Sequence, residues 1–346
     1  MPSLQQSIAA GPRVRTVALE EHFNVPDLLK RIPPDQMIAG GFPSPDRAPP
    51  LMGHASQKLP DTGRGRLANM DANGIDLQVL SWAGPGAELL SGHEANSFAR
   101  DANDLLAESI GANPSRFAGF AHLPVSDPAC AAAELERSIE KLGFVGAIVN
   151  GTTNGLFLDD ARFEPLLATA ERLGKPLYLH PGVPPKPVRD AYYGRLPTPL
   201  DFVLATYGFG WHAEVAIHVL RLVLSGTLDR HPKLKLIIGH CGEYLPMTLA
   251  RTSQFVGNDA PNRSARTVVE TLREQLWVTS SGMFTSTPLR AAIAVFGVER
   301  ILFSVDYPYS ENGEAETFLS GLELAPADRE LFLHGNADRL LGLTIA

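Results

Sequence analysis

The sequence predicts an α/β fold, a (β/α)8 TIM barrel with long insertions after strands 1 and 5. Eight short runs rich in Val, Ile, Leu and Phe are each long enough for one strand. Most of these runs are continuously apolar, which is typical of strands covered on both faces. Helical patterns separate most of the runs, and a repeated strand-then-helix order indicates a parallel sheet. Eight such units favour closure into a barrel.

The expected strands span residues 14–22, 76–82, 117–124, 143–150, 176–181, 234–241, 275–281 and 300–307. The expected helices span residues 64–73, 88–111, 128–141, 160–173, 211–230, 243–253 and 287–297. Neither a sequence repeat nor a clear linker interrupts this series. We therefore expect a single domain over residues 14–346, preceded by a flexible leader over residues 1–13.

Two segments do not fit the minimal strand-and-helix unit. Residues 33–62 are rich in Pro and Gly and show no periodic pattern, and residues 183–210 are similar but carry aromatic side chains, among them Tyr192 and Phe209. Both segments follow strands that end in possible metal ligands, so both should emerge at the mouth where such barrels build their sites. Long loops of this kind in a compact domain are usually functional or disordered. The aromatic residues favour a lid over a flat substrate, although they could equally form an oligomer contact.

Composition limits the classes of partner. The chain has 346 residues and a formal net charge of -8, and its Lys and Arg residues are scattered, which argues against a nucleic-acid surface. No apolar stretch is long enough to span a bilayer. The first residues lack a signal-peptide pattern, so a cytoplasmic location is expected. The two cysteines, Cys130 and Cys241, form no Cys-x-x-Cys pair, and both are expected to pack as small apolar side chains.

Four of the apolar runs end in side chains that can hold a metal ion. One run ends in Glu20 and His22, and the others end in His180, His240 and Asp306. The carboxyl ends of parallel barrel strands meet at one face, where active sites lie. A packed core gains nothing from unpaired charges there, because their burial is costly. One divalent ion gathered from several strands would explain all four runs.

The individual positions support this reading. Glu20 and His22 share one strand face because residues i and i+2 point alike, whereas Glu21 points outward and is not expected to be a ligand. His180 closes its strand before a Pro-Gly turn, and Asp306 ends an apolar strand. Each motif alone could be a solvated strand end or a core histidine. Together, two imidazoles and two carboxylates suit Zn²⁺ or Mn²⁺.

The segment Gly-His-Cys-Gly-Glu at 239–243 differs from the other three. Glu243 follows His240 by three residues and could orient the imidazole, which would make His240 an acid/base or an electrostatic clamp. The alternative is that Glu243 only complements the dipole of a first helical turn. His212 begins a helix after the second insertion and is a further candidate for contact with the substrate.

These elements together resemble the amidohydrolase superfamily. The branch that they resemble holds the metal-dependent, non-oxidative decarboxylases of aromatic acids, of the hydroxybenzoate and 5-carboxyvanillate types. The matching motifs lie at residues 18–23, 179–181, 239–243 and 303–309, with further similarity at 143–147, 218–222 and 335–340. Hydrolytic members usually begin with His-x-His on strand 1, whereas this chain has Glu-x-His, as in the decarboxylases. Cys241 stands where a methionine is expected.

The resemblance implies a set of roles. The expected metal ligands are Glu20, His22, His180 and Asp306. The expected catalytic residues are His240, Glu243 and Asp306. No lysine that would bridge two metals is evident, so the resemblance implies one ion, Zn²⁺ or alternatively Mn²⁺, and no organic cofactor. The expected substrate-binding residues are Phe23, Tyr192, Phe209, His212 and Tyr309.

The activity implied by the resemblance is non-oxidative decarboxylation of a hydroxylated aromatic carboxylic acid. Asp306 would then give a proton to the ring carbon that bears the carboxylate, with His240 assisting. The alternative is hydrolysis of a lactone or amide, in which Asp306 would deprotonate the attacking water. A barrel that only binds a ligand is a third reading. The resemblance also implies a homodimer or homotetramer with a small aromatic acid as its substrate.

Overall fold

Eight parallel strands form one sheet in the order of the chain, in a computed structural model that describes residues 13–256 and 266–343. The strands are β1 (Val17–Phe23), β2 (Leu77–Trp82), β3 (Phe117–His122), β4 (Gly146–Asn150), β5 (Leu177–His180), β6 (Leu236–Ile238), β7 (Leu276–Thr279) and β8 (Ile301–Leu302). A parallel bridge between Leu19 and Ser304 joins the last strand to the first. The predicted barrel of eight parallel strands is confirmed.

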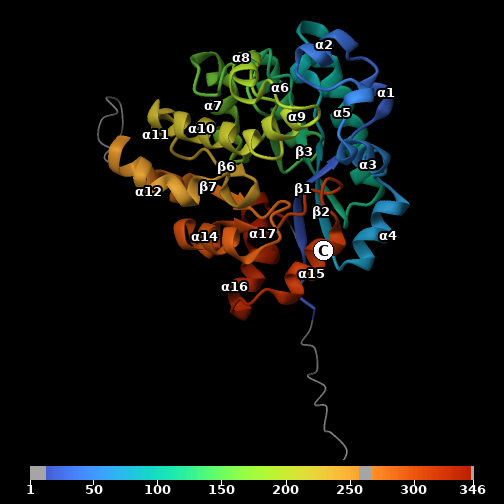
Figure 1. The fold of residues 1–346 in the computed structure, drawn as a ribbon. Coiled ribbons are helices and arrows are strands. Elements are labelled where there is room, and N and C mark those ends of the chain that lie inside the picture. Colours follow the sequence, from blue (N-terminus) through green and yellow to red (C-terminus); the bar gives the residue numbers. More distant parts are fainter. Residues whose placement is uncertain (1–12, 257–265, 344–346) are drawn as a thin grey trace, which may run out of the picture.

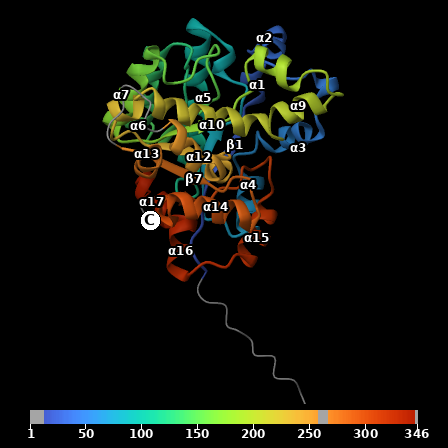
Figure 2. The same ribbon diagram turned by 60° about the vertical axis from the view of Figure 1, so that its left-hand side comes forward.

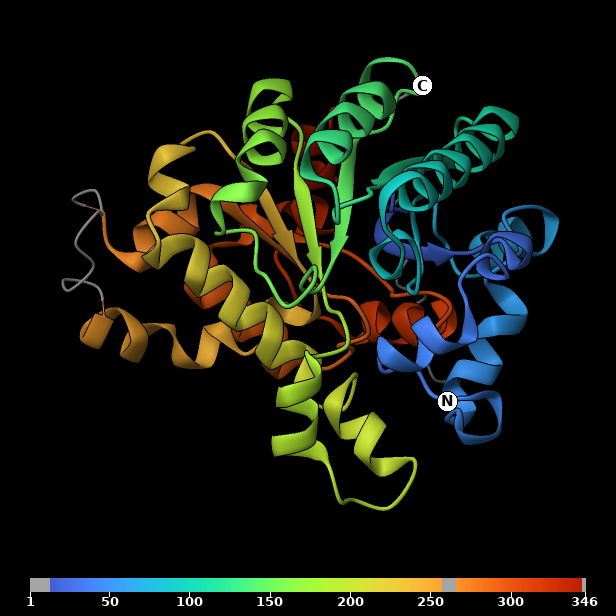
Figure 3. The same ribbon diagram turned by 90° about the horizontal axis from the view of Figure 1, so that it is seen from above.

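Helices surround the strands, as the view from above shows (Figure 3). The α-helices are α1 (Pro26–Leu29), α2 (Pro34–Ala39), α3 (Pro50–Lys58), α4 (Arg64–Ala72), α5 (Gly92–Ala112), α6 (Pro128–Glu140), α7 (Glu164–Leu173), α8 (Lys186–Val188), α9 (Leu200–Ala205), α10 (Gly210–Leu224), α11 (Thr227–Arg230), α12 (Leu245–Val256), α13 (Val268–Gln275), α14 (Ser286–Phe296), α15 (Asn312–Gly321), α16 (Pro326–Glu330) and α17 (Asn336–Leu341). Short 3₁₀ or π turns occur at Pro45–Arg47, Ala87–Leu89, Ala161–Phe163, Arg189–Tyr193, His240–Gly242, Val298–Arg300 and Leu331–Gly335. No helix in the described ranges is long and apolar enough to cross a membrane.

Local sequence explains where the outer helices begin and end. The α6 helix starts after Asp127, whose carboxylate accepts a hydrogen bond from the Cys130 N–H at 3.1 Å, and Pro128 occupies its first turn. The α7 helix ends at Gly174, which adopts φ 64°, a conformation that glycine reaches without strain. Both helices bury one apolar face against the sheet, and the α6 face includes Ala131 and Leu135.

The strand β1 contains a bulge that decides which side chains face the barrel interior. The pairing with β2 shifts between Ala18 and Glu21, and Glu20 has φ 61°. Val17 and Leu19 pack with the inward-facing Tyr178, so an unbroken alternation would turn Glu20 and His22 away from the barrel interior. The extra residue shifts the alternation by one position, so that Glu20 and His22 face inward while Glu21 points outward.

All eight strands are shorter than expected, and the difference is largest for β6 and β8. The run at 234–241 contains β6 over Leu236–Ile238, and the run at 300–307 contains β8 over Ile301–Leu302. The chain leaves the extended conformation where His240 (φ 50°) and Asp306 (φ 69°) turn to the left-handed region. These two side chains therefore stand on irregular segments just beyond the strand ends.

The two insertions are not structureless, which corrects the sequence analysis. Residues 33–62 contain α2 and α3, and residues 183–210 contain α8 and α9. Their prolines suggested loops, but α2, α3 and α8 each have a proline in the first turn, where the missing N–H costs nothing. In Figures 1 and 2, α1, α2 and α9 lie at the upper end of the barrel and α16 at the lower end.

Helices in the last part of the chain were also missed. The helix α13 and the helices α15 to α17 were not expected, although α13 begins with a capping box between Thr267 and Glu270. Of the expected leader over residues 1–13, all but Arg13 lies outside the described residues.

Two glycines let β4 and β5 approach each other where these strands end. A Cβ placed on Gly182 would lie 2.8 Å from the Cα of Gly151, which is closer than real Cβ atoms come to backbone. We predict that Gly182→Ala lowers the free energy of unfolding by about 1–3 kcal/mol, as overpacking usually does. Urea unfolding followed by circular dichroism measures this change.

The matched control is Gly111→Ala in α5, where an added Cβ meets nothing within 4 Å. This control should be neutral or stabilising by up to about 1 kcal/mol, because alanine favours a helix. Equal effects of the two variants would contradict the close approach.

Candidate active site

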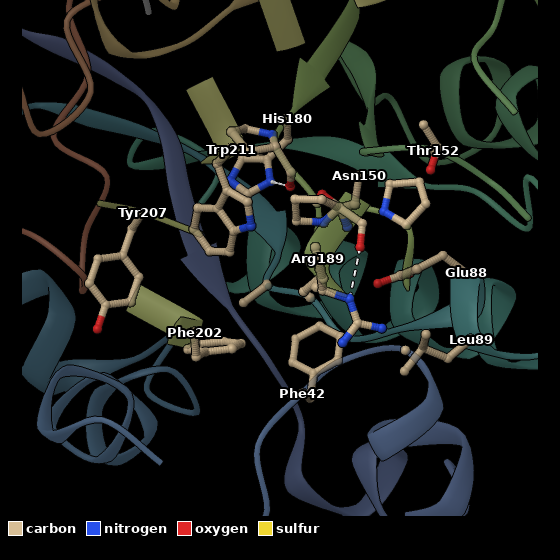
Figure 4. A pocket seen from close by; sticks show the side chains of 18 of the residues that line it. Phe42, Glu88, Leu89, Asn150, Thr152, His180, Arg189, Phe202, Tyr207 and Trp211 are labelled. Carbon is tan, nitrogen blue, oxygen red and sulfur yellow. Dashed lines mark hydrogen bonds between the residues drawn. The ribbon is translucent and has the colours of Figure 1, made fainter. Parts of the chain in front are cut away.

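A cavity of about 950 Å³ opens at the carboxyl ends of the strands, between the two insertions. Its wall combines strand ends with residues of both insertions, and Figure 4 shows part of it. Of the candidate residues named from the sequence, those that line the cavity are His22, His180, His212, His240, Asp306 and Tyr309. This volume and position are typical of a small-molecule site.

The four proposed metal ligands come together at the base of this cavity. The ligand atoms of Glu20, His22 and His180 all lie within 4.8 Å of one another. Glu20 Oε1 is 3.3 Å from His180 Nε2, and Asp306 Oδ1 is 3.2 Å from His22 Nε2. Residues from β1, β5 and the segment after β8 thus form one cluster of two carboxylates and two imidazoles.

Two buried atoms of this cluster are left without a hydrogen bond. Glu20 Oε1 and His22 Nε2 have no hydrogen-bond partner among the described residues. Glu20 Oε2, by contrast, accepts hydrogen bonds from the hydroxyls of Tyr178 and Ser281. Leaving buried polar atoms unpaired is costly, so these atoms call for a partner that the chain does not supply. A divalent ion fits this set of nitrogen and oxygen atoms.

The far sides of both imidazoles are held by hydrogen bonds. His180 Nδ1–H donates to the carbonyl oxygen of Pro181 at 2.8 Å, which leaves the Nε2 lone pair free to face Glu20. His22 Nδ1 and Ser81 Oγ share a hydrogen bond of 3.2 Å. Such contacts fix the tautomer and the orientation of histidines that bind metals.

The electrostatics of the metal-free cluster favour the ligand forms of His180 and Asp306 but oppose the carboxylate form of Glu20. Burial lowers the pKa of His180 to about 3, so its imidazole is neutral. Burial raises the pKa of Glu20, and the charge of Asp306 adds to this effect, whereas His240 and His22 lower it. Burial also acts to raise the pKa of Asp306, but the nearby imidazoles of His22 and His240 bring it to about 2. A bound cation would stabilise both carboxylates further.

A second cluster lies beside the first and contains Glu243, His240 and His212. The Glu243 carboxylate accepts a hydrogen bond from His240 Nδ1 at 2.7 Å and another from His212 Nδ1 at 2.6 Å. Burial acts to raise the pKa of Glu243, but His240 and His212 lower it to about 2. Burial acts to lower the pKa of His240, but Glu243 and Glu20 raise it well above its usual value. The buried carboxylate of Glu243 therefore favours the protonated form of His240.

Asp306 connects the two clusters. Its Oδ2 is 3.8 Å from His240 Nε2, while its Oδ1 faces His22. His240 and Glu243, which were expected to act as a pair, are hydrogen-bonded to each other. His212 is a second hydrogen-bond partner of Glu243. His212 was expected to contact the substrate; its ring does line the cavity, but its Nδ1 is engaged by Glu243.

The backbone around the site is strained. His240, Cys241, Glu243 and Tyr244 all have φ between 50° and 65°, a region that side chains other than glycine rarely adopt. Each such residue costs of order 1 kcal/mol, and such residues cluster at functional sites. Burial raises the pKa of the Cys241 thiol to about 12, so it remains a packed, protonated side chain and not a nucleophile.

Glu21 and Arg66 support the cluster from outside the barrel. Glu21 is fully buried, and its carboxylate accepts hydrogen bonds from the N–H of Val305 at 2.9 Å and of Tyr307 at 3.3 Å, the two residues that flank Asp306. Arg66 donates to the carbonyl oxygen of His22. Burial raises the pKa of Glu21 to about 8, whereas the two backbone donors and Arg66 lower it. The sequence analysis placed Glu21 outward but did not find this role.

Three of the five expected substrate-binding residues do not line the cavity. Phe23 is 2% exposed and its ring packs on Trp82 at 5.6 Å, because the strand turns it outward after the inward His22. Tyr192 is 76% exposed and contacts Tyr193, and Phe209 is 48% exposed and contacts Tyr244. The aromatic side chains that do line the cavity are Phe42, Phe202, Tyr207, Trp211 and Tyr309.

Comparisons with known proteins agree with this geometry. The amidohydrolase family model matches residues 22–343. Decarboxylase orsB of Emericella nidulans is 37% identical over 340 residues, which cover 94% of this chain and 96% of that protein.

Two solved structures are similar over the length of the barrel. Dihydroxybenzoic acid decarboxylase from Polaromonas sp., with bound manganese and the inhibitor 2-nitroresorcinol, has a TM-score of 0.84 at 34% identity and covers 96% of this chain and 98% of its own. The 5-carboxyvanillate decarboxylase of Sphingomonas paucimobilis has a TM-score of 0.86 at 31% identity and covers 96% of this chain and 100% of its own.

The support given by Glu21 is testable through metal affinity. We predict that Glu21→Gln weakens binding of Zn²⁺ or Mn²⁺ by roughly 10–100-fold, the usual effect of losing a group that orients metal ligands. The reason is that Glu21 uses two acceptor oxygens, one for each of the N–H groups of Val305 and Tyr307, whereas glutamine has a single acceptor oxygen and its NH₂ group would face one of these donors. Competition with a chromogenic chelator measures the affinity. Glu94→Gln, at a side chain 65% exposed on α5, is the control, and equal affinities in both variants would contradict the role.

The pair of His240 and Glu243 predicts how the stability of the metal-free protein depends on pH. The pKa of Glu243 is lowered from 4.5, so its stabilising effect is complete above pH 4.5 and disappears as pH falls towards 2. The pKa of His240 is raised, so its stabilising effect is complete below pH 6.5 and disappears as pH rises through the raised value.

The difference in free energy of unfolding between wild type and Glu243→Gln should therefore be largest between pH 4.5 and 6.5, at roughly 3 kcal/mol, and shrink on both sides. Urea unfolding across this pH series measures it. A difference that does not change with pH would show that the two groups are not coupled as described.

Proposed function

Because the chain belongs to the amidohydrolase family, as its resemblance predicted, we propose that it is a metal-dependent decarboxylase of a hydroxylated aromatic carboxylic acid. The observation that carries this proposal is that Asp306 stands between His22, a proposed metal ligand, and His240 within one cavity. The reaction releases carbon dioxide without oxidation, and the names of its relatives support this class.

We assign one divalent ion, Zn²⁺ or alternatively Mn²⁺, to Glu20, His22, His180 and Asp306. The two unpaired buried atoms of Glu20 and His22 support this assignment. When bound, such an ion supplies Lewis acidity to the acid and hydroxyl oxygens of the substrate. No organic cofactor is needed, because protonation of the ring supplies the driving step.

The walls of the cavity suit a flat anion. Trp211, Phe202 and Tyr207 line it with aromatic surface, which packs against a ring and excludes water. Lys186 and Arg189, from the second insertion, line the same cavity. Their charges attract a carboxylate to a protein whose net charge is -8.

Proton transfer is the task of His240 and Asp306. His240 is a cation whose Nδ1 is held by Glu243, so the proton that it can give is on Nε2, which faces Asp306 Oδ2 at 3.8 Å. Asp306 carries the proton to the ring carbon that bears the carboxylate. The bond between that carbon and the carboxylate then breaks, its electron pair restores the aromatic ring, and carbon dioxide leaves. Each turnover consumes one proton, which solvent returns to His240.

We also propose that the chain is organised as a single domain. Residues 14–346 act as one domain, a view supported by the single sheet that contains all eight strands. A homodimer or homotetramer and a cytoplasmic location stay predictions, and sedimentation and cell fractionation measure them.

Replacing the proton donor tests the mechanism. We predict that Asp306→Asn lowers kcat for carbon dioxide release by roughly 10²–10⁴-fold, because an amide oxygen can still face a metal but the side chain cannot transfer a proton. The measurement is carbon dioxide release from a panel of hydroxybenzoates, with the metal content determined in the same samples.

Full activity of Asp306→Asn with metal bound would contradict the assignment. Production of an acid or amine from lactones or amides, without carbon dioxide release from any aromatic acid, would favour the hydrolase alternative instead.

A further inference from the structure

The buried carboxylate of Glu243 has a second partner, which the proposed proton transfer does not use. His212, on α10, is 5% exposed, and its Nδ1–H donates to Glu243 Oε2 at 2.6 Å. The other oxygen of Glu243, Oε1, accepts the hydrogen bond from His240 Nδ1 at 2.7 Å. Each oxygen of this carboxylate is therefore paired with one imidazole, and His240 is the one whose Nε2 faces Asp306.

The ring of His212 is itself held in place. Its Nε2 lies 3.3 Å from the carbonyl oxygen of Tyr207. The ring also packs edge-on against His240 and Tyr244, with centroid distances of 4.8 Å and 5.3 Å. A ring that is held at both nitrogens and packed against two others cannot turn away from Glu243 without losing these contacts. His212 therefore has the rigidity that is needed to orient another group.

The orientation of Glu243 depends on this partner. Glu243 is fully buried, and its backbone has φ 52°. Without His212, Oε2 would be a buried acceptor that has lost its hydrogen bond, which is costly. The carboxylate would gain by turning Oε2 towards another donor or by taking up a proton. Either change would alter the hydrogen bond that orients His240.

The backbone that holds His212 belongs to the wall of the cavity. Tyr207 and Trp211 pack on each other at a centroid distance of 6.1 Å, and both line the cavity (Figure 4). The same short segment thus gives aromatic surface to the cavity through its side chains and holds His212 through the carbonyl of Tyr207. His212 also lines the cavity, but both of its nitrogens are engaged by the protein.

We propose that His212 is a positioning residue for the proton transfer: it holds Glu243 in the orientation that directs His240 Nε2 at Asp306. This inference rests on the proposed function. It replaces the substrate contact that was expected of His212 with a role exerted through Glu243. The contacts run from the carbonyl of Tyr207 through His212 and Glu243 to the proton donor.

A metal ion is the alternative occupant of this second cluster. The ligand atoms of His212, His240 and Glu243 lie within 4.8 Å of one another. Both Nδ1 atoms, however, face oxygens of Glu243 at hydrogen-bond distance. In the first cluster, by contrast, Glu20 Oε1 and His22 Nε2 have no partner among the described residues. The contacts therefore favour an ion in the first cluster and hydrogen bonds in the second.

The experiment uses the metal-loaded full chain. His212→Leu removes both ring nitrogens, whereas His212→Asn keeps an N–H near the place of Nδ1. The matched control is His218→Asn, because His218 is another buried histidine on α10, whose Nε2 accepts from the N–H of Leu158 at 3.0 Å. Carbon dioxide release gives kcat and KM, isothermal titration calorimetry gives the affinity for the aromatic acid, and elemental analysis gives the metal content.

His212→Leu should lower kcat by roughly 10–100-fold, as misplacement of a reacting group does, and change KM and the calorimetric affinity by less than about threefold. His212→Asn should return kcat to within about threefold of wild type, and His218→Asn should keep it. All variants should bind one ion per chain. In the background of Glu243→Gln, His212→Leu should have little further effect, because it acts through that carboxylate.

Proton transfer can also be measured without cleavage of the carbon–carbon bond. In D₂O, the phenolic product should exchange the hydrogen on the ring carbon that had lost the carboxylate, and NMR follows this exchange. The exchange needs the same protonation of the ring carbon as the forward reaction. His212→Leu should therefore slow the exchange by about the same factor as kcat.

Four results would each overturn the inference while leaving the decarboxylase intact. They are an unchanged kcat in His212→Leu, a loss confined to KM, a loss of equal size in His218→Asn, and a second bound ion that is lost with His212. A wild type that hydrolyses a lactone or amide without releasing carbon dioxide, with kcat lost in His212→Leu and restored in His212→Asn, supports the positioning role and rejects the decarboxylase. Absence of both activities rejects both.

Discussion

The seam between β1 and β8 is the constraint on which the rest of the site depends. The barrel closes there through the bridge of Leu19 to Ser304 and through Glu21, whose carboxylate takes the N–H groups on both sides of Asp306. Three of the four proposed metal ligands stand on this seam, Glu20 and His22 on one strand and Asp306 after the other. A sheet that stopped short of closure would leave the carboxylate of Asp306 without its place beside His22.

The site also illustrates how buried charge can be kept without loss of the fold. Glu243 is satisfied by two imidazoles, and one oxygen of Glu20 is satisfied by the hydroxyls of Tyr178 and Ser281. The second oxygen of Glu20 and the Nε2 of His22, by contrast, have no hydrogen-bond partner among the described residues. Because the surrounding groups are held by hydrogen bonds, these two atoms cannot turn away to find partners. The cost of burying unpaired polar atoms therefore falls on a small set of atoms. A bound cation would offset this cost by pairing with these atoms.

The sequence could predict the barrel and the residues that gather at the ends of its strands because both depend on local patterns. A continuously apolar run ending in a histidine or a carboxylate is visible in one dimension, as at His180 and Asp306. The contacts of Glu21 with Val305 and Tyr307 join residues nearly 300 positions apart, so no local pattern reveals them. The cavity wall was hard to predict for another reason. Phe202 lines the cavity and Phe209 does not. This difference depends on how the short helices of the second insertion are oriented.

The sharing of Asp306 limits how this active site can vary. Its two oxygens face different imidazoles, His22 at 3.2 Å and His240 at 3.8 Å, and its backbone is held at φ 69° between two N–H groups that donate to Glu21. A shift of this residue towards one imidazole is a shift away from the other, so metal binding and proton transfer cannot be adjusted independently there. The insertions have no such shared role, because Phe42, Phe202 and Tyr207 line the cavity and take no part in the proposed metal binding or proton transfer. Differences in substrate are therefore more easily accommodated in these walls than at the seam that holds the reacting groups.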